Sequence, residues 1–403
     1  MKTFTRFLQE EANPEPEGQK LKHLTHLEDF VIHHGNDGVK HAANIMDDVH
    51  KKLLGKETKT KVSVKYDGAP SIVFGHHPTN GRFFVASKSA FNKTPKLNYT
   101  DQDVEANHGH APGLVEKLKH ALKHLPKVAP HKGVYQGDMM YTKNDIQHKN
   151  KKYHFTPNTI TYSTPEDSHH GAAIKHAKMG VVVHTKYEGK DLDNMGATPN
   201  VDRHNFKHHP DVHNIDPELK THSQHYSSAD QNKYHEHMEN ARKKYSSMKP
   251  EALDAVKEHS VHLETHINDE VKKNGKPTSD GFIKHMTDKH QKEVSKLKSA
   301  AAVDRKHAAF SSRIKSITQN KKHIDDALEL HHHFQRAKDV LTRAMAKNAE
   351  FDHHIGGAKS SPEGAVAVRD GHMAKFVDRA EFSRQNFLAS KMKMAKAENN
   401  EKV

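Results

Sequence analysis

Residue periodicity changes twice along this chain, and this limits the folds open to it. Between 60 and 92, apolar and polar residues alternate, as in half-buried strands. From about 216 to 350, glycine and proline become scarce and apolar residues recur at helical spacing. Strand character returns at 363–378. We expect the flanking strands to share one sheet, which makes the helical block an insertion.

The sequence therefore predicts an α+β protein in which an antiparallel sheet domain carries a large α-helical insertion. The expected segments are an N-terminal segment and linker (1–23), the first part of the core (24–190), the helical insertion (191–355), the second part of the core (356–396) and a tail (397–403). The expected helices outside the insertion are 24–54, broken near Gly35–Gly38, then 101–125 and 381–396. The expected strands are 62–66, 71–74, 83–89, 133–141, 154–162, 180–187 and 363–378, and 190–215 is expected to be a polar loop.

Composition narrows the class of protein. The formal charge of +13, with 40 histidines besides, favours polyanionic partners, although a well-hydrated surface explains it equally well. The absence of cysteine excludes disulfides, cysteine zinc sites and thiol catalysis. No apolar run is long enough to cross a membrane, and the start lacks the apolar region of a signal peptide. We expect a cytoplasmic protein without a membrane partner.

The strand Val62-Ser63-Val64-Lys65-Tyr66 places a lysine beside a core. Desolvation or neighbouring cations can deprotonate such a lysine, and its neutral amine can attack the α-phosphate of a nucleotide. Asp67 shares a strand face with Lys65 and can orient the amine or approach a sugar, while Gly68 lets the backbone approach a ligand. A Lys-x-Asp-Gly sequence arises by chance about one time in ten in such a lysine-rich chain. An exposed strand lysine is therefore the alternative.

Two later residues extend this chemistry. Glu363 opens a strand and can hold Mg²⁺ on nucleotide phosphates, because hard cations prefer oxygen ligands. Lys375 can neutralise the α-phosphate as its charge develops. Taken alone, Glu363 is better explained as a loop glutamate, and Lys375 as a solvated edge-strand lysine.

Polar residues at two strand ends offer further ligands. Gly137 and Asp138 offer an acidic residue at a strand end, and the carboxylate suits a ribose hydroxyl or a metal ion, with a turn aspartate as the alternative. Ser87 and Lys88 can reach a phosphate or a sugar, although a plain strand lysine is the simpler interpretation.

The strand at 180–187 can also line a pocket. His184 and Lys186 alternate onto one face, with a purely structural role as the alternative. An aromatic ring is expected to stack on the nucleotide base, and Tyr135, Phe155 and Tyr162 are equally good candidates.

Together these segments resemble the lysine nucleotidyltransferase superfamily, which comprises ATP-dependent DNA ligases, RNA ligases and mRNA capping enzymes. Lys65-Tyr66-Asp67-Gly68 matches motif I, Ser87-Lys88 resembles motif Ia and Gly137-Asp138 resembles motif III. Glu363-Gly364-Ala365-Val366 matches motif IV, and Lys375 stands where motif V supplies a lysine. The overall character of the sequence, with its Met-Lys-Thr-Phe start, also resembles uncharacterised ligase-like proteins of large tailed phages.

The resemblance implies an ATP-grasp-like nucleotidyltransferase domain that uses ATP and Mg²⁺. With help from Lys375, Lys65 would form lysyl-AMP. Glu363 and Asp138 would bind the metal. The enzyme would then seal the ends of RNA or DNA. A phage protein of this kind would act in the host cytoplasm. The alternatives are another acceptor, as in GTP capping or protein nucleotidylation, or a non-catalytic phage nucleic-acid-binding or virion-associated protein that retains the fold.

The chain departs from the family pattern in several places. Met373 replaces the first of two motif V lysines, a helical block separates motifs III and IV, and few residues remain after Lys375 for an oligonucleotide-binding barrel. A two-residue turn at Asp370-Gly371 would also place Glu363 and Lys375 on opposite faces. We therefore expect a bulge or a three-residue turn at Arg369–His372.

Histidines recur in pairs and triples. His262 and His266 have the i, i+4 spacing of some zinc sites, but neither an acid nor a cysteine completes a recognisable set. A polar helix surface is the expected role, with structural zinc as the alternative.

Overall fold

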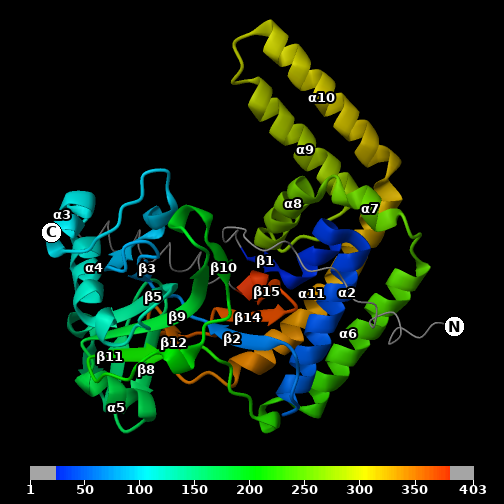
Figure 1. Ribbon diagram of the computed structural model, residues 1–403. Coiled ribbons are helices and arrows are strands. Elements are labelled where there is room, and N and C mark those ends of the chain that lie inside the picture. Colours follow the sequence, from blue (N-terminus) through cyan, green and yellow to red (C-terminus); the bar gives the residue numbers. More distant parts are fainter. Residues whose placement is uncertain (1–23, 382–403) are drawn as a thin grey trace, which may run out of the picture.

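The computed structural model describes residues 24–381 and has the α+β composition that the sequence predicts, with helices and largely antiparallel sheets (Figure 1). The expectations for the N-terminal segment, the helix at 381–396 and the tail lie outside these residues or reach only their edge. Over residues 24–381, every helix falls short of the length and apolarity that crossing a bilayer requires.

Sheet A is the four-stranded sheet that joins the two ends of the described chain. Its strands, in spatial order, are β1 (Thr25–His26), β15 (His372–Phe376), β14 (Gly364–Arg369) and β2 (Lys61–Lys65). β14 is antiparallel to both neighbours, and β1 runs parallel to β15. One face of the sheet presents Val62, Ala365, Ala367, Ala374 and Phe376 to the largest hydrophobic core. The opposite face is free to carry polar side chains.

Two long helices, α2 (Phe30–Leu53) and α11 (Lys321–Ala346), cover the apolar face of sheet A. The short helix η1 (Leu27–Asp29) precedes α2. The other helices of this part of the molecule are α6 (Ser228–Ser247), α7 (Ala252–Lys257), α8 (Ser260–Lys272), α9 (Ser279–Val294) and α10 (Ala300–Gln319). α2 packs against α11, and both contact β14. The predicted break in the first helix is present, since Gly35 has a φ of 59°. The helical block therefore shares its core with an earlier helix and with sheet A.

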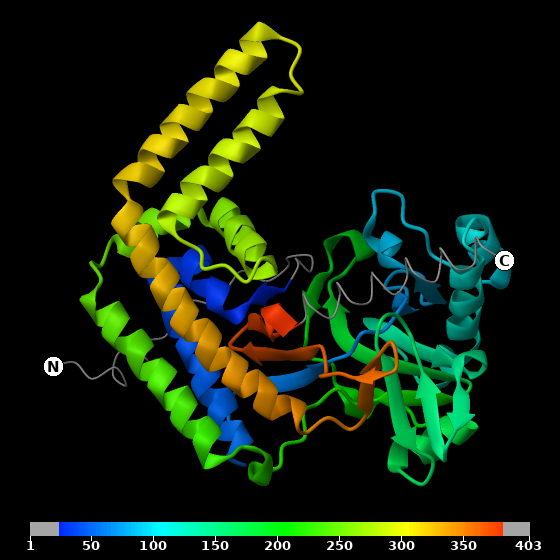
Figure 2. The same ribbon diagram turned by 180° about the vertical axis from the view of Figure 1, so that it is seen from behind.

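α9 and α10 form a helical hairpin that extends away from the rest of the molecule (Figures 1 and 2). We call this hairpin and its connecting turn, residues 279–319, the arm. Phe282, Met286 and Ile317 anchor its base in the core of the helical block.

Sheet B forms the centre of the other lobe. Its strands are β10 (Gly196–Thr198), β9 (Met179–Glu188), β5 (Val134–Thr142), β3 (Ser71–His76) and β4 (Phe83–Ala86), and β11 (Val212–Ile215) lies parallel to β9. One face is covered by α3 (Asp101–His108) and α4 (Pro112–His124) through a second hydrophobic core.

The 3-10 helices after η1 are η2 (Lys88–Phe91), η3 (Leu125–Lys127), η4 (Lys143–Asp145), η5 (Leu192–Asn194), η6 (Arg203–Asn205) and η7 (Ser223–His225).

Sheet C is a small antiparallel sheet beside sheet B. It consists of β13 (Ala358–Lys359), β12 (Asp352–Ile355), β8 (Thr161–Pro165), β7 (Lys152–Phe155) and β6 (Gln147–Lys149), with α5 (His169–His176) against it. The hydrophobic core around Tyr141, Phe155 and Phe351 joins it to sheet B.

Several expected elements differ from the structure. The single helix at 101–125 is two helices, because Pro112 lacks an amide hydrogen and begins a new one. The single strand at 154–162 is the β7–β8 hairpin, and the loop at 190–215 contains β10 and β11. The segment predicted as the insertion, 191–355, therefore begins and ends with strands of sheets B and C, and its long helices run only from 228 to 346.

Candidate active site

Sheet A brings two lysines from opposite ends of the chain to one face. Lys65 on β2 pairs with Gly364 on β14, and Val366, two residues further, pairs with Lys375 on β15. Side chains directly opposite each other share a face, and residues two apart on one strand do so as well. Lys65 and Lys375 therefore point to the same side of the sheet, away from α2 and α11.

The expected bulge in the β14–β15 hairpin is absent. Arg369 pairs with His372 across a turn of two residues, Asp370 and Gly371, which both have positive φ angles. This is the turn type that an Asp-Gly pair favours, because it matches the twist of the strands. The prediction of a bulge or three-residue turn at Arg369–His372 was wrong.

The backbone conformation of Gly364, and not a bulge, brings Glu363 to the Lys65 side of the sheet. Its φ of 148° interrupts the alternation of side chains at the start of β14, so Glu363 reaches the Lys65 side of the sheet. A Cβ atom at 364 would lie 2.2 Å from the carbonyl oxygen of Phe376, so only glycine fits here. The Lys65 ammonium donates a hydrogen bond to Glu363 Oε1.

The Glu363 carboxylate is buried, but within residues 24–381 only one of its two oxygens has a hydrogen-bond partner. Its side chain is 9% exposed, against 31% for Lys65, and Oε2 has no hydrogen-bond partner among the described residues. Burial raises the pKa of Glu363, the Lys65 ammonium lowers it, and the carboxylates of Asp67 and Asp138 raise it further. The net shift is upward, which marks a carboxylate that would gain from a further cation.

Lys375 is a half-buried cation on the same face. Burial lowers its pKa, as do Arg379 and Lys65, while Asp29 and Glu264 oppose the shift. No acidic group in residues 24–381 lies within ion-pair distance of its ammonium. Arg379 and Glu264 were missed at the sequence level, because no spacing along the chain connects them with Lys375.

Asp138 and His184 approach this face from sheet B. The pairing of β5 with β9 shifts register between Gln136 and Gly137, and His184 is the extra residue on β9. This bulge directs the imidazole towards Asp138, with His184 Nε2 3.5 Å from Asp138 Oδ2. Gly137 is required here, since a Cβ atom would lie 2.6 Å from the carbonyl oxygen of Val182.

Asp67 holds a loop rather than the Lys65 amine. Its Oδ1 accepts from the side chain of Asn158 at 2.8 Å, and its Oδ2 accepts from the backbone amides of Thr159 at 2.9 Å and Ile160 at 3.2 Å. These bonds commit the carboxylate to the turn between β7 and β8. The structure does not support a direct role of Asp67 in orienting the amine or a sugar.

The remaining motif residues have local structural roles. A Cβ atom on Gly68 would lie 2.6 Å from Asp138 Cβ, so this glycine permits close packing against β5. Ser87 Oγ accepts from the backbone amide of Ser89 and caps η2, whereas Lys88 is exposed. Among the described residues, no hydrogen bond or ion pair joins Ser87 or Lys88 to Lys65 or Glu363.

None of the three aromatic candidates can stack on a base. Tyr135 is buried in the core between sheet B and α4, and Phe155 and Tyr162 are fully buried beside sheet C. Each ring packs against other rings, so no face is left for a ligand. The prediction of a stacking role failed because strand alternation does not reveal which face another layer covers.

Lys186 does not share a face with His184. It pairs with Tyr135, whose side chain points to the opposite side of sheet B, and its ammonium lies 2.6 Å from Glu188 Oε1. The bulge at His184 shifts the alternation of β9 by one residue, which a period of two cannot anticipate.

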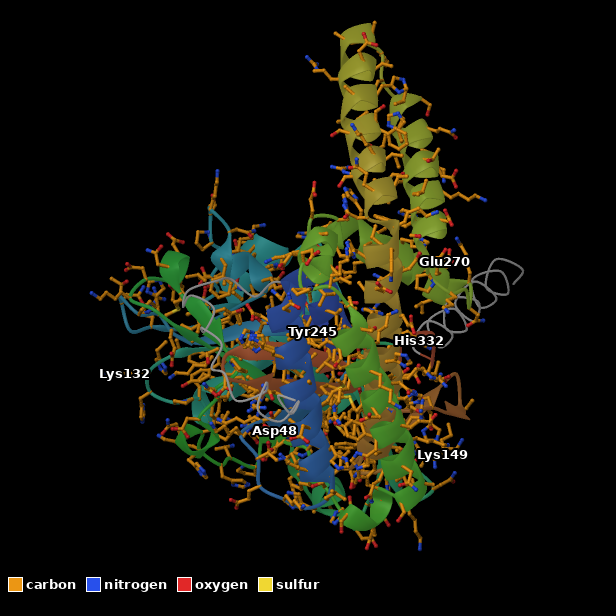
Figure 3. The ribbon with its side chains drawn as sticks, turned by 90° about the vertical axis from the view of Figure 1, so that its right-hand side faces the viewer. Asp48, Lys132, Lys149, Tyr245, Glu270 and His332 are labelled. Carbon is orange, nitrogen blue, oxygen red and sulfur yellow. The ribbon has the colours of Figure 1, made fainter. Side chains whose placement is uncertain are left out.

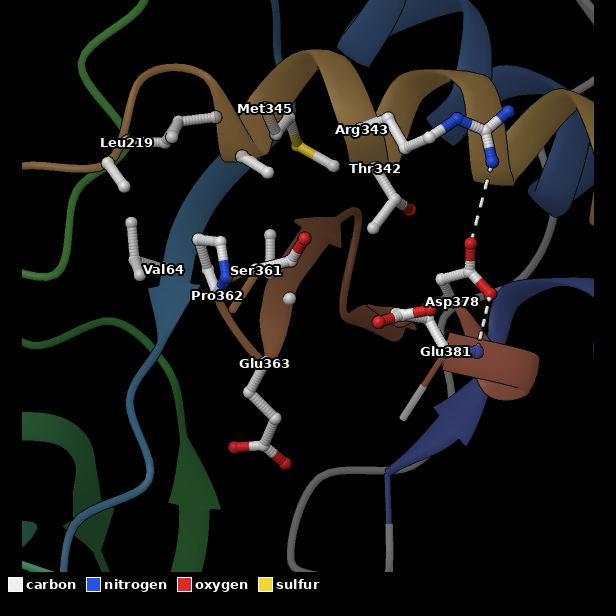
Figure 4. A pocket seen from close by; sticks show the side chains of 14 residues that line it. Val64, Leu219, Thr342, Arg343, Met345, Ser361, Pro362, Glu363, Asp378 and Glu381 are labelled. Atoms are coloured by element: carbon white, nitrogen blue, oxygen red, sulfur yellow. Dashed lines mark hydrogen bonds and ion pairs between the residues drawn. The ribbon is translucent and has the colours of Figure 1, made fainter. Parts of the chain in front are cut away.

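A cavity of about 300 Å³ lies on the other side of sheet A, between the sheet and α11 (Figure 4). Val64, Thr342, Met345 and Pro362 contribute to its lining. Glu363 stands at its border, but the carboxylate points away from it (Figure 4). The cavity is therefore separate from the Lys65 site.

The histidine prediction fails for one of the two residues singled out in the sequence. In residues 24–381, no three acidic or histidine side chains gather closely enough to hold a metal ion unaided. His266 is buried beside Phe282 and His285, so the expected polar surface role is wrong for this residue.

The comparisons with known proteins give a family but no activity. A family model described as "Family of unknown function (DUF6267)" matches residues 20–391. No curated protein and no solved structure matches.

Proposed function

The chain belongs to this family of unknown function, DUF6267, and we propose that it is an ATP-dependent, polynucleotide ligase-like nucleotidyltransferase. The observation that carries the proposal is the meeting of Lys65, Glu363 and Lys375 on one face of sheet A. The resemblance to lysine nucleotidyltransferases assigns these three residues as nucleophile, metal-binding acid and phosphate-binding cation. In sequence, the first lies about three hundred positions from the other two.

Lys65 is the nucleophile in this proposal. Its amine, once it has lost a proton, attacks the α-phosphate of ATP, so that a P–N bond forms and the P–O bond to pyrophosphate breaks. Lys375 offsets the negative charge that develops on the phosphate oxygens.

Glu363 fits the role of a Mg²⁺ ligand. Its Oε2 is buried without a partner, and Asp138 lies close enough to raise its pKa. Magnesium sites often use only one or two carboxylates and complete the shell with substrate phosphates, which agrees with the small number of acids here. Mg²⁺ held by Glu363 would supply positive charge next to the phosphates of ATP. The Lys65 ammonium pairs with Oε1 of the same carboxylate, which leaves Oε2 as the oxygen for the metal.

The AMP acceptor is proposed to be a 5′-phosphate at a nucleic-acid end. The phosphate oxygen displaces Lys65 from AMP, and a 3′-hydroxyl then displaces AMP and seals the strand. The basic excess of the chain supports a polyanionic substrate, because lysine and arginine release counterions from phosphates.

A second candidate is a non-catalytic nucleic-acid-binding protein with the same fold. Met373 favours it, since this side chain shares the face of Lys375 and carries no charge where motif V has a lysine. The Asp67 carboxylate, which accepts hydrogen bonds from the β7–β8 loop, favours the non-catalytic candidate as well. The other nucleotidyltransferase alternatives keep the Lys65 chemistry and differ in nucleotide or acceptor.

The deciding experiment is covalent labelling of the full chain with α-³²P-ATP and Mg²⁺, followed by a denaturing gel. We expect label from α-labelled ATP, none from γ-labelled ATP, and a loss of about 10³-fold or more in Lys65→Ala. Lys61→Ala is the matched control, because Lys61 lies on the same strand and face and should keep its label. Label from GTP alone would indicate the capping alternative. A wild-type protein that takes up label from neither nucleotide refutes the nucleotidyltransferase proposal.

A further inference from the structure

The arm begins beside the candidate site. α8 leads into α9, and Glu264 on α8 is close enough to Lys375 to affect its pKa. Glu264 also pairs with His33 on α2, with Oε2 2.9 Å from Nε2. From this base the arm rises on one side of the molecule, opposite α3 and α4, with β1 and β15 lying between them (Figures 1 and 2). A long ligand at the site would therefore pass the arm.

The arm has an excess of positive charge. Residues 279–319 contain seven lysines and two arginines against three aspartates and one glutamate. Lys292, Lys296, Lys298 and Arg305 are exposed around its outer end and make no ion pair with any described residue. Side chains with charged tips line both helices of the arm in Figure 3.

The outer half of the arm adds little to folding. The arm residues buried in the main core are Phe282, Met286 and Ile317, all near the base, and Ile283, Phe310 and Ile314 pack against this core while only partly buried. No residue from 287 to 309 belongs to it. At the far turn, Leu297 is 39% exposed between two lysines. A stable helical pair could carry charges of both signs, so unpaired cations on a projecting element point to an external anion.

The arm offers phosphate contacts without base contacts. Proteins that bind single strands usually stack bases on exposed aromatic rings. Phe282 is fully buried, and Phe310 stacks against His290 with ring centres 4.0 Å apart, so neither ring is presented to a ligand. An arm with cations and no stacking surface suits a duplex, whose charge lies on its outside.

We propose that the outer half of the arm binds the phosphate backbone of a double-stranded nucleic acid whose end or nick lies at Lys65. This deepens the proposed function and rests on it for the reaction at the site. The evidence for an anion-binding surface on the arm is independent of that reaction.

The test compares two triple charge reversals in the full chain. Lys292→Glu, Lys296→Glu and Lys298→Glu change the arm, whereas Lys56→Glu, Lys59→Glu and Lys149→Glu change exposed lysines elsewhere by the same charge. Lys149 lies at the opposite end of the molecule from the arm (Figure 3). Circular dichroism confirms that both variants fold, and fluorescence anisotropy then measures binding to a nicked duplex and to a single strand across a salt series.

We expect the wild type to prefer the duplex and the arm variant to lose about 10-fold or more in affinity at low salt. The slope of log K against log salt should fall by about 0.9 for each phosphate contact removed, or about 3 for three lysines. The control variant should behave like the wild type. Equal losses in both variants, a preference for the single strand, or no nucleic-acid binding by the wild type would each overturn the inference.

Labelling by α-³²P-ATP alone separates this inference from the proposed function. The arm variant should still form the labelled lysine, because its changes lie far from Lys65. If arm-dependent duplex binding is found without any labelling, the arm assignment stands and the nucleotidyltransferase proposal fails. If labelling is found without arm-dependent binding, the nucleotidyltransferase proposal stands and the arm assignment fails.

Discussion

Two clusters of charged residues, one beside the end of β15 and one on the polar face of sheet A, shift the pKa of a buried carboxylate in opposite directions. The first, which we call the ion network, consists of Glu28, Asp29, His331, Lys338 and Arg379, all nearly or fully buried. Lys338 Nζ lies 2.8 Å from Glu28 Oε1, His331 Nε2 lies 2.8 Å from Asp29 Oδ1, and Arg379 pairs with both acids. The second cluster is the candidate active site.

The pKa values show the difference. Burial alone raises the pKa of Glu28, but the charges of Lys338 and Arg379 outweigh it and lower the pKa to about 2. Burial also raises the pKa of Glu363, and the single half-exposed Lys65 does not overcome it. The number of cations around a buried carboxylate therefore separates a structural ion cluster from a site that has room for a ligand.

The ion network supports the candidate site. Lys338 Nζ also donates to the carbonyl oxygen of Val377 at 2.7 Å, directly after β15. Through this bond and Arg379, the network ties the end of β15 to η1 and α11. Lys375 on β15 is therefore held by a rigid frame, and mutations in the two clusters should have different consequences.

The largest effect on stability is expected for Arg379→Met. This change leaves Asp29 and Glu28 buried with too few cations, and breaking a buried pair in this way typically costs about 3–5 kcal/mol. Arg343→Met is the matched control, because Arg343 is exposed and its contact with Asp378 should be worth about 1 kcal/mol or less. Urea unfolding measures both. Equal effects would show that the network is no more structural than a surface pair.

A smaller effect on stability, with loss of function, is expected for Gly364→Ala. The positive φ and the clash with Phe376 should cost about 1–3 kcal/mol and misdirect Glu363. Gly357→Ala is the control, since its φ is also positive but a Cβ atom there meets nothing within 4 Å. We expect about 1–2 kcal/mol for the control, from its positive φ alone, and normal covalent labelling. Normal labelling of Gly364→Ala would contradict the role assigned to this glycine.

The smallest effect concerns pH. Because the pKa of Glu363 is higher in the folded chain than in the unfolded chain, this group stabilises the fold below its unfolded pKa. That contribution is lost as the pH rises through the folded pKa. Between pH 5 and pH 8, the wild type should therefore lose more stability than Glu363→Gln, by about 1 kcal/mol or less. The lowered pKa of Glu28 gives the opposite slope at acidic pH, but it is common to both proteins and cancels in the difference.

Thermal unfolding at several pH values measures this difference, and covalent labelling is run in parallel. Glu363→Gln should fold normally at neutral pH and label poorly. A large destabilisation would place Glu363 with the ion network instead.

Much of sheet A was accessible from local sequence. Alternation identified the strands that carry Lys65 and Lys375, and the Asp370-Gly371 pair indicated the hairpin between β14 and β15. The same reasoning failed at Gly364 and His184, because a positive φ or a bulge breaks the period of two without a clear signal in the neighbouring residues. It also failed for Tyr135, which is covered by a helix from another part of the chain.

The sequence by itself determined the local elements and which side chains alternate within them, since both depend on residues a few positions apart. Only the tertiary structure decided that Glu363 meets Lys65, that Asp67 turns to the β7–β8 loop, and that Arg379 joins Glu28 and Asp29 in the interior. The physical reason is that burial and charge pairing depend on neighbours in space. At this site those neighbours come from both ends of the described chain.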